Sequence, residues 1–181
     1  MMKKQLLILA AVMALLALVA CSPAGNTTKG CPSATTGTQL LTNEEHGYCL
    51  LYPAEYYVAY PTENGTCLAP VVDSMQCHSA NAFIVVDNAA GRTASQVADA
   101  LVAELPGFNI ERASLTIADE EAVVLDNLPG QDILRKVVIV HADRLYTLTF
   151  MPWDKNRGQE YTQLENLYAM VINSFNFLPG K

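Results

Sequence analysis

The stretch ILRKVVIVHADRLYTLTFM, residues 133–151, decides the expected fold of this chain. Two runs rich in β-branched and aromatic residues, 133–142 and 145–151, flank the polar pair Asp143-Arg144, a pattern typical of a tight β-hairpin. In the second run large apolar side chains alternate with smaller or polar ones, which predicts one buried face and one face in water. The hairpin therefore indicates an antiparallel sheet.

A helix is expected after this hairpin. Beyond the loop 152–158, apolar side chains recur at helical spacing from Tyr161 to Phe175. The run Phe177-Leu178 would then form a short terminal strand.

A second helix is expected before the hairpin. Thr93 and Gln96 have the spacing of a capping box, and apolar residues follow at four-residue intervals until Pro106-Gly107 ends the pattern.

Five more segments have strand composition: 48–52, 56–60, 82–87, 108–117 and 121–128. Residues 67–80 are expected to form an irregular loop. These patterns predict an α+β fold, an antiparallel β-sheet packed with helices, in one domain of residues 40–181.

Residues 1–20 have the three parts of a bacterial lipoprotein signal peptide. Lys3 and Lys4 precede an apolar run that is shorter than the ~20 residues of a membrane-spanning helix. The following Leu18-Val19-Ala20-Cys21 resembles a lipobox, so Cys21 is expected to carry lipid. We therefore expect attachment to a bacterial membrane, either the cell membrane or the outer membrane, with the domain facing outside the cytoplasm. An ordinary secretory signal peptide is the alternative.

Composition limits the partners of the mature chain. Residues 21–39 hold the lipidated cysteine and a run of mostly small and polar residues, which predicts a flexible linker. The 161 residues after the leader suffice for one domain and hold 9 basic against 18 acidic side chains. Because so acidic a chain is repelled by phosphate backbones, no nucleic-acid binding is expected.

Four cysteines remain once Cys21 carries lipid: Cys31, Cys49, Cys67 and Cys77. An even number in an oxidising compartment predicts two disulfides, for which three pairings exist. We favour Cys31–Cys49 with Cys67–Cys77, because both close short loops. A metal site of Cys67, Cys77 and His78 is the alternative, but its spacing lacks a C-x-x-C pair; no metal or other cofactor is expected.

No motif in the sequence predicts catalysis. His46 and His141 are expected to be solvated, and His78 beside Cys77 is the histidine least easily dismissed. The candidate paired carboxylates lie in turns or at strand ends, where a solvated acidic edge is the simpler interpretation (Glu120, Glu121, Asp126 and Asp132). We therefore expect the protein not to be an enzyme.

Aromatic residues give the candidate binding surface. Five tyrosines lie between Tyr48 and Tyr60, and Tyr56, Tyr57 and Tyr60 are the expected surface contacts. Trp153, in the loop before the last helix, is a further candidate. Ordinary sheet packing of the tyrosines and core packing of the tryptophan are the alternatives.

Two local patterns resemble the PsbP-like α/β sandwich, a family known from the lumenal extrinsic protein of photosystem II. They are the strand ending in Tyr52-Pro53 and the run from Tyr146 to Phe150 that leads through a helix to Ile172-Asn173-Ser174-Phe175. The resemblance covers about residues 40–178. It implies an antiparallel sheet with helices on both sides and a protein that acts by binding. The four cysteines are not part of the photosynthetic pattern, so no functional residue is carried over.

Three functions remain open at this point. The first is a membrane-anchored, non-catalytic binding or accessory module for a protein or envelope component. The second is an extracytoplasmic carrier of a small ligand, with its pocket between sheet and helix. The third is a small hydrolase that uses His78 or a pair of carboxylates.

Overall fold

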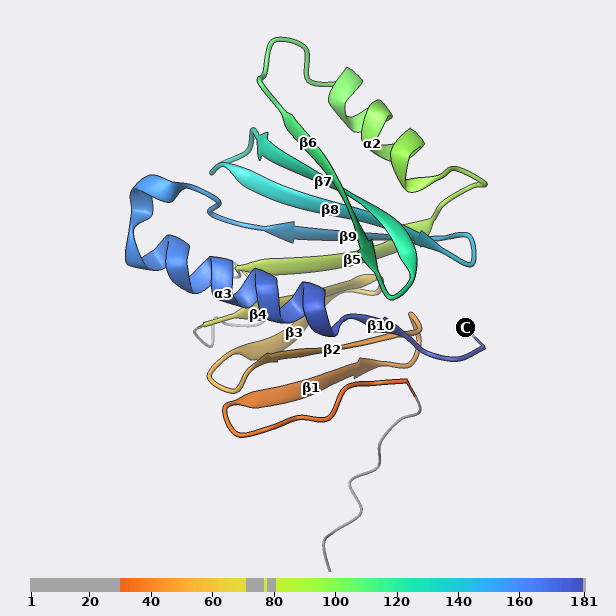
Figure 1. The fold of residues 1–181 in the computed structure, drawn as a ribbon, viewed down its shortest axis with the longest axis vertical. Coiled ribbons are helices and arrows are strands. Elements are labelled where there is room, and N and C mark those ends of the chain that lie inside the picture. The colour runs from red at the N-terminus through yellow and green to blue at the C-terminus, as the bar shows by residue number, and fades with distance from the viewer. Residues whose placement is uncertain (1–29, 71–76, 78–80, 181) are drawn as a thin grey trace, which may run out of the picture.

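The computed structural model describes residues 30–70, 77 and 81–180. Two antiparallel sheets form the frame, one of seven strands in the order β3-β4-β5-β9-β8-β7-β6 and one of three in the order β1-β2-β10 (Figure 1). The α+β class expected from the sequence is confirmed. No helix in this described part is long and apolar enough to cross a membrane.

The smaller sheet consists of β1 (Thr38–Asn43), β2 (Tyr48–Pro53) and β10 (Asn176–Phe177). The larger one consists of β3 (Tyr57–Thr62), β4 (Gly65–Ala69), β5 (Ala82–Asn88), β6 (Glu111–Ile117), β7 (Glu120–Leu128), β8 (Leu134–His141) and β9 (Arg144–Phe150). The helices are α2 (Ala94–Ala103), the 3-10 turn η1 (Lys155–Arg157) and α3 (Gln159–Ser174).

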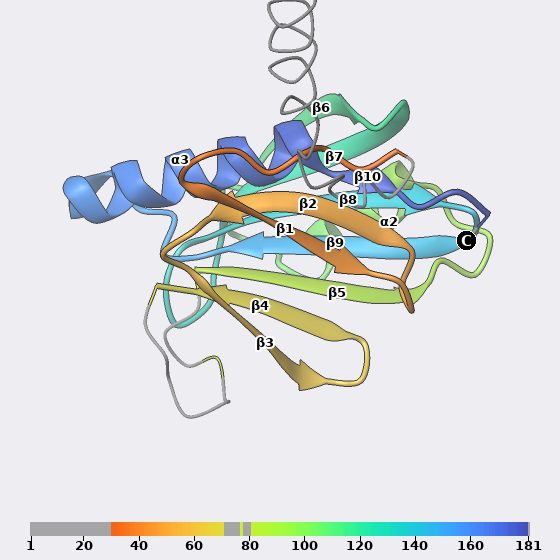
Figure 2. The same cartoon turned by 90° about the horizontal axis from the view of Figure 1, so that it is seen from below.

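Elements cover both faces of the large sheet. Helix α3 and the small sheet lie over one face, and α2 lies over β7 and β8 on the other, as Figures 1 and 2 show. The larger core lies on the α3 side and includes Tyr146, Leu148 and Phe150 of β9. A smaller core under α2 includes Val97, Val123 and Val138.

The predicted hairpin 133–151 is present as β8 and β9. Its turn is Ala142-Asp143 and not the expected Asp143-Arg144, because His141 pairs with Arg144 at the end of the two strands. Both turn residues have positive φ (49° and 59°). The expectation of one wet face is wrong for this strand: Leu145, on the face opposite Tyr146, is buried in the core under α2.

The helix start at Thr93 is confirmed. The Thr93 hydroxyl accepts the N–H of Gln96, and the Gln96 side chain accepts the N–H of Thr93, which completes the capping box. Helix α3 buries Leu164, Leu167 and Val171 against the larger core.

Two strands were not predicted. Residues 65–69, at the start of the expected irregular loop, form β4, a central strand with all five residues buried. Both faces of β4 are covered, so its sequence lacks the polar–apolar alternation of a half-exposed strand. The edge strand β1 was missed because TQLLTN has few β-branched or aromatic residues.

Candidate functional site

A cleft of about 660 Å³ opens between two turns of the chain. One wall is the turn between β1 and β2, with Glu44, Glu45 and His46, and the other is the hairpin between β3 and β4, with Tyr60 and Glu63. Thr42, Asn43, Pro61 and Thr62 complete the lining.

The first wall is held by bonds within the turn and to β9. The Asn43 carboxamide oxygen accepts the N–H of His46 at 3.0 Å, and Gly47 closes the turn at φ +74°. The Tyr146 hydroxyl donates to the His46 carbonyl at 2.9 Å, and Arg144 donates to the Glu45 carbonyl at 3.3 Å. The Glu44 and Glu45 side chains are exposed at the rim of a well-anchored turn.

The second wall is the β3–β4 hairpin. The register of its strands shifts between Ala59 and Thr62, where Pro61 interrupts the pairing. Gly65 is required here, because a Cβ atom would lie 2.5 Å from the Thr62 hydroxyl oxygen. The Asn64 carboxamide donates to Asp87 at 2.8 Å and ties the hairpin to β5.

Two hydrogen bonds connect the two walls: the Asn43 carboxamide donates to the Thr66 hydroxyl of β4 at 3.4 Å, and His46 contacts Glu63. The Nε2 atom of His46 lies 3.0 Å from the Glu63 carbonyl oxygen. His46 was expected to be simply solvated, and it instead makes a hydrogen bond across the cleft. Beneath it, the buried Tyr48 hydroxyl donates to Thr66 at 2.8 Å, and burial raises the pKa of Tyr48 to about 12 despite that bond.

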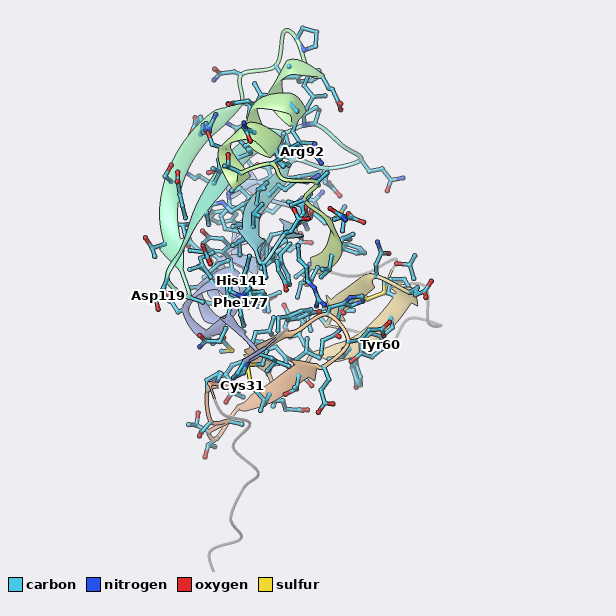
Figure 3. The ribbon with its side chains drawn as sticks, turned by 90° about the vertical axis from the view of Figure 1, so that its right-hand side faces the viewer. Cys31, Tyr60, Arg92, Asp119, His141 and Phe177 are labelled. Atoms are coloured by element: carbon cyan, nitrogen blue, oxygen red, sulfur yellow. A yellow bond between two sulfur atoms is a disulfide. The ribbon has the colours of Figure 1, made fainter. Side chains whose placement is uncertain are left out.

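The cleft combines negative charge with an aromatic ring. Glu44, Glu45 and Glu63 are exposed and form no ion pair with any described residue. Tyr60 is 60% exposed, and Figure 3 shows it at the β3 side of the molecule, apart from His141 and Phe177. Carboxylates beside an aromatic face suit a cationic group, such as a lysine or arginine side chain.

The predicted aromatic surface is only partly present. Tyr57 and Tyr60 are exposed, but they do not meet, since Tyr57 does not line the cleft. Tyr56 and Trp153 are buried, and they are removed from the candidate surface. The Tyr56 hydroxyl donates to the half-buried Asn81, and Trp153 packs edge-on against Tyr161 and Tyr168.

Two of the candidate acids are held in ion pairs with arginine, and a third contacts a histidine. Asp126 binds Arg135 through two bonds of 2.6 Å, Glu120 lies 2.7 Å from Nδ1 of His141, and Asp132 pairs with Arg157. His141 is therefore not simply solvated, and its ring also stacks on Phe177 with centroids 4.0 Å apart. The fourth acid, Glu121, is exposed on β7.

Both expected disulfides are present, Cys31–Cys49 and Cys67–Cys77. The alternative metal site is wrong, because Cys67 and Cys77 have no thiolates to offer; His78 lies outside the described residues. Within the described ranges no cluster of three metal-ligating side chains occurs. Cys21, the expected lipidation site, also lies outside them.

Disulfides persist in oxidising compartments, so the two crosslinks indicate an extracytoplasmic location. Fold and crosslinks together define a disulfide-stabilised, extracytoplasmic α+β domain.

No protein-family model matches the chain, and no curated protein matches it. Among solved structures it is similar to cyanobacterial PsbP (CyanoP) from Synechocystis sp. PCC 6803, with 13% identity over 88% of this chain and 98% of that one and a TM-score of 0.47. It is also similar to PA94 from Pseudomonas aeruginosa, a protein of unknown function described as a putative regulator. The identity is 21% over 72% of this chain and 94% of that one, with a TM-score of 0.35. Similarities of this size support no functional argument.

Proposed function

We propose that this protein is a lipid-anchored, extracytoplasmic, non-catalytic binding module that contacts a partner in the cell envelope through the acidic cleft. The observation that carries the proposal is the exposed Tyr60 ring beside the carboxylates of Glu44, Glu45 and Glu63. The chemistry fits a partner protein that presents lysine or arginine side chains.

The anchor would place the cleft near the membrane. The first described residue, Gly30, lies beside Phe177 and Pro179, and the next is crosslinked to β2. If lipid is attached at Cys21, eight residues lie between it and Gly30, a span of about 30 Å when fully extended. The partner would therefore be a membrane protein or a component close to the membrane surface.

The ion pairs support a non-catalytic role. General acid–base catalysis needs carboxylates or imidazoles that reach a substrate. Glu120, Asp126 and Asp132 each contact a basic side chain of this chain instead. The acids of the cleft are exposed on turns, where they are placed for contact with a partner.

A carrier of small ligands is the second candidate. A groove of about 500 Å³ lies between β6 and α3, where that hypothesis expected a pocket between sheet and helix. Its lining mixes apolar residues such as Leu115 and Ile172 with Asn173 and Asn176.

Zero-length crosslinking tests the proposal. A carbodiimide joins a carboxylate directly to an amine that it contacts, so native membranes carrying the full-length protein should yield a discrete crosslinked species. The combined change Glu44→Gln, Glu45→Gln and Glu63→Gln should abolish it.

The matched control is the combined change Glu55→Gln, Glu104→Gln and Glu165→Gln, which removes the same charge from exposed positions elsewhere. It should leave the crosslinked species unchanged. Loss of the species in both variants, or in neither, would argue against the cleft as the contact site.

A further inference from the structure

The seven-stranded sheet has two edges, and only one of them is blocked. The β3 edge carries Pro61 and a register shift between Ala59 and Thr62, two devices that hinder pairing with another strand. The β6 edge has neither, since it pairs with β7 in unbroken register from Glu111 to Ile117. No described strand pairs with its outer side.

The composition of β6 also leaves its edge open. Residues 113–117 carry no charge and no proline. Arg112, the basic residue of the strand, contacts α2, where it pairs with Asp99 and donates to the Ser95 hydroxyl at 2.7 Å. Alternate residues of an edge strand direct their N–H and C=O groups outward, so β6 offers a row of backbone bonding groups.

A groove runs beside this edge. It lies between β6 and α3, with Leu115, Ile117, Ile172 and Phe175 as its apolar lining and a volume of about 500 Å³. Figure 1 shows the β6–β7 hairpin reaching toward the C-terminal end of α3. A strand added to β6 would direct every second side chain toward this groove.

The charges of the β6–β7 hairpin select the occupant. Glu111, Asp119 and Glu121 of the β6–β7 hairpin form no ion pair with any described residue. A second copy of this chain would bring the same acids to the contact, and the whole chain has a net charge of −7. Charge complementarity therefore favours a basic partner over self-association.

We infer that the β6 edge and the α3 groove bind an extended, basic segment of a partner protein by strand addition, with apolar side chains at alternate positions in the groove. This surface is separate from the acidic cleft, and the inference does not depend on the function proposed for that cleft.

The test uses the full-length protein and the peptide acetyl-(Lys-Val)4-amide. The peptide should bind and slow backbone hydrogen exchange in residues 113–117, with no change in β3. The peptide acetyl-(Glu-Val)4-amide should not bind.

Backbone methylation separates strand addition from charge attraction. Two further peptides carry N-methyl groups on all lysines or on all valines, so each lacks the N–H donors of one edge. Because one of these peptides loses several backbone donors to β6, its binding should weaken by about 10–100-fold. Equal affinity of all three basic peptides would overturn the inference.

Variants locate the site independently. Ile172→Lys places a positive charge in the groove and should abolish binding, whereas Ala103→Lys on the exposed side of α2 should not. If Ile172→Lys fails to fold, the methylated peptides still test whether binding uses the backbone of β6.

The combined variant Glu44→Gln, Glu45→Gln and Glu63→Gln should still bind the basic peptide. Protection of β6 in a dimer of the protein alone, or no peptide binding, would overturn the inference.

Discussion

The guanidinium carbon of Arg135 lies 3.9 Å from the centroid of the Trp153 ring. It also lies 4.5 Å from the centroid of the Tyr168 ring, and Asp126 holds the guanidinium group through two hydrogen bonds of 2.6 Å. This contact connects β8, the loop after β9 and α3. It explains why the single tryptophan is a structural residue.

Removal of the Arg135 side chain should therefore destabilise the fold. Arg135→Ala leaves the Asp126 carboxylate unpaired at a site where both side chains are only about one-fifth exposed. We expect a loss of about 2–4 kcal/mol in the free energy of unfolding, measured by urea titration. Arg135→Lys keeps the charge but not the bidentate geometry, so it should recover only part of the loss. Equal stability of the alanine variant and the wild type would contradict this role.

The Cys31–Cys49 disulfide should contribute on the order of 3 kcal/mol, because it closes a loop with a sequence separation of 18. The double change Cys31→Ala and Cys49→Ala should lower the urea midpoint accordingly. It should also make residues 30–37 sensitive to limited proteolysis, while β2 to β9 stay protected. An unchanged cleavage pattern would show that the crosslink does not hold this segment to the domain.

Alkaline pH should unfold the protein through its buried tyrosines. Tyr48 has its pKa raised from 10.0 to about 12 by burial, so the folded state holds its proton more tightly than the unfolded state. The stability that this provides is complete below pH 10 and is lost as the pH rises from 10 to 12, to the extent of about 3 kcal/mol. Burial also raises the pKa of Tyr146 and Tyr168.

Absorbance at 295 nm measures tyrosinate, and circular dichroism measures the fold. Both should change together above pH 10 as the buried tyrosines ionise. Full ionisation at pH 11 with an intact fold would contradict the burial of Tyr48.

The lipid anchor is tested by labelling with an alkyne fatty acid. If Cys21 is lipidated, as we propose from the resemblance of residues 18–21 to a lipobox, the wild-type chain should incorporate the label and partition with membranes. Cys21→Ser should incorporate none and should be recovered outside the membrane fraction or as an uncleaved precursor. Labelling of the serine variant would exclude Cys21 as the site.

Sequence patterns predicted the elements whose signals are local. The capping box at Thr93, the hairpin of residues 133–151 and the helix on Leu164 and Val171 are all present. Strand β4 was missed because burial on both faces removes its alternation.

The cleft could not be predicted, because its two walls lie about 18 residues apart in the chain. Glu44 and Glu63 have ordinary turn composition, and only the packing of the two sheets brings their turns together. Of the aromatic candidates, Tyr60 lines the cleft. Tyr56 was expected at the surface but is buried, because composition alone does not tell which side of the backbone packs against the core.

We propose that the cleft contacts an envelope partner, and a photo-crosslinking amino acid at position 60 tests this contact. Irradiation of living cells should join the full-length protein to one discrete partner from position 60. Position 108, where Phe108 is similarly exposed on the connection between α2 and β6, should give no such product. The product from position 60 should disappear when Glu44, Glu45 and Glu63 are changed to glutamine. A product of equal yield from both positions, or none from position 60, would contradict the account.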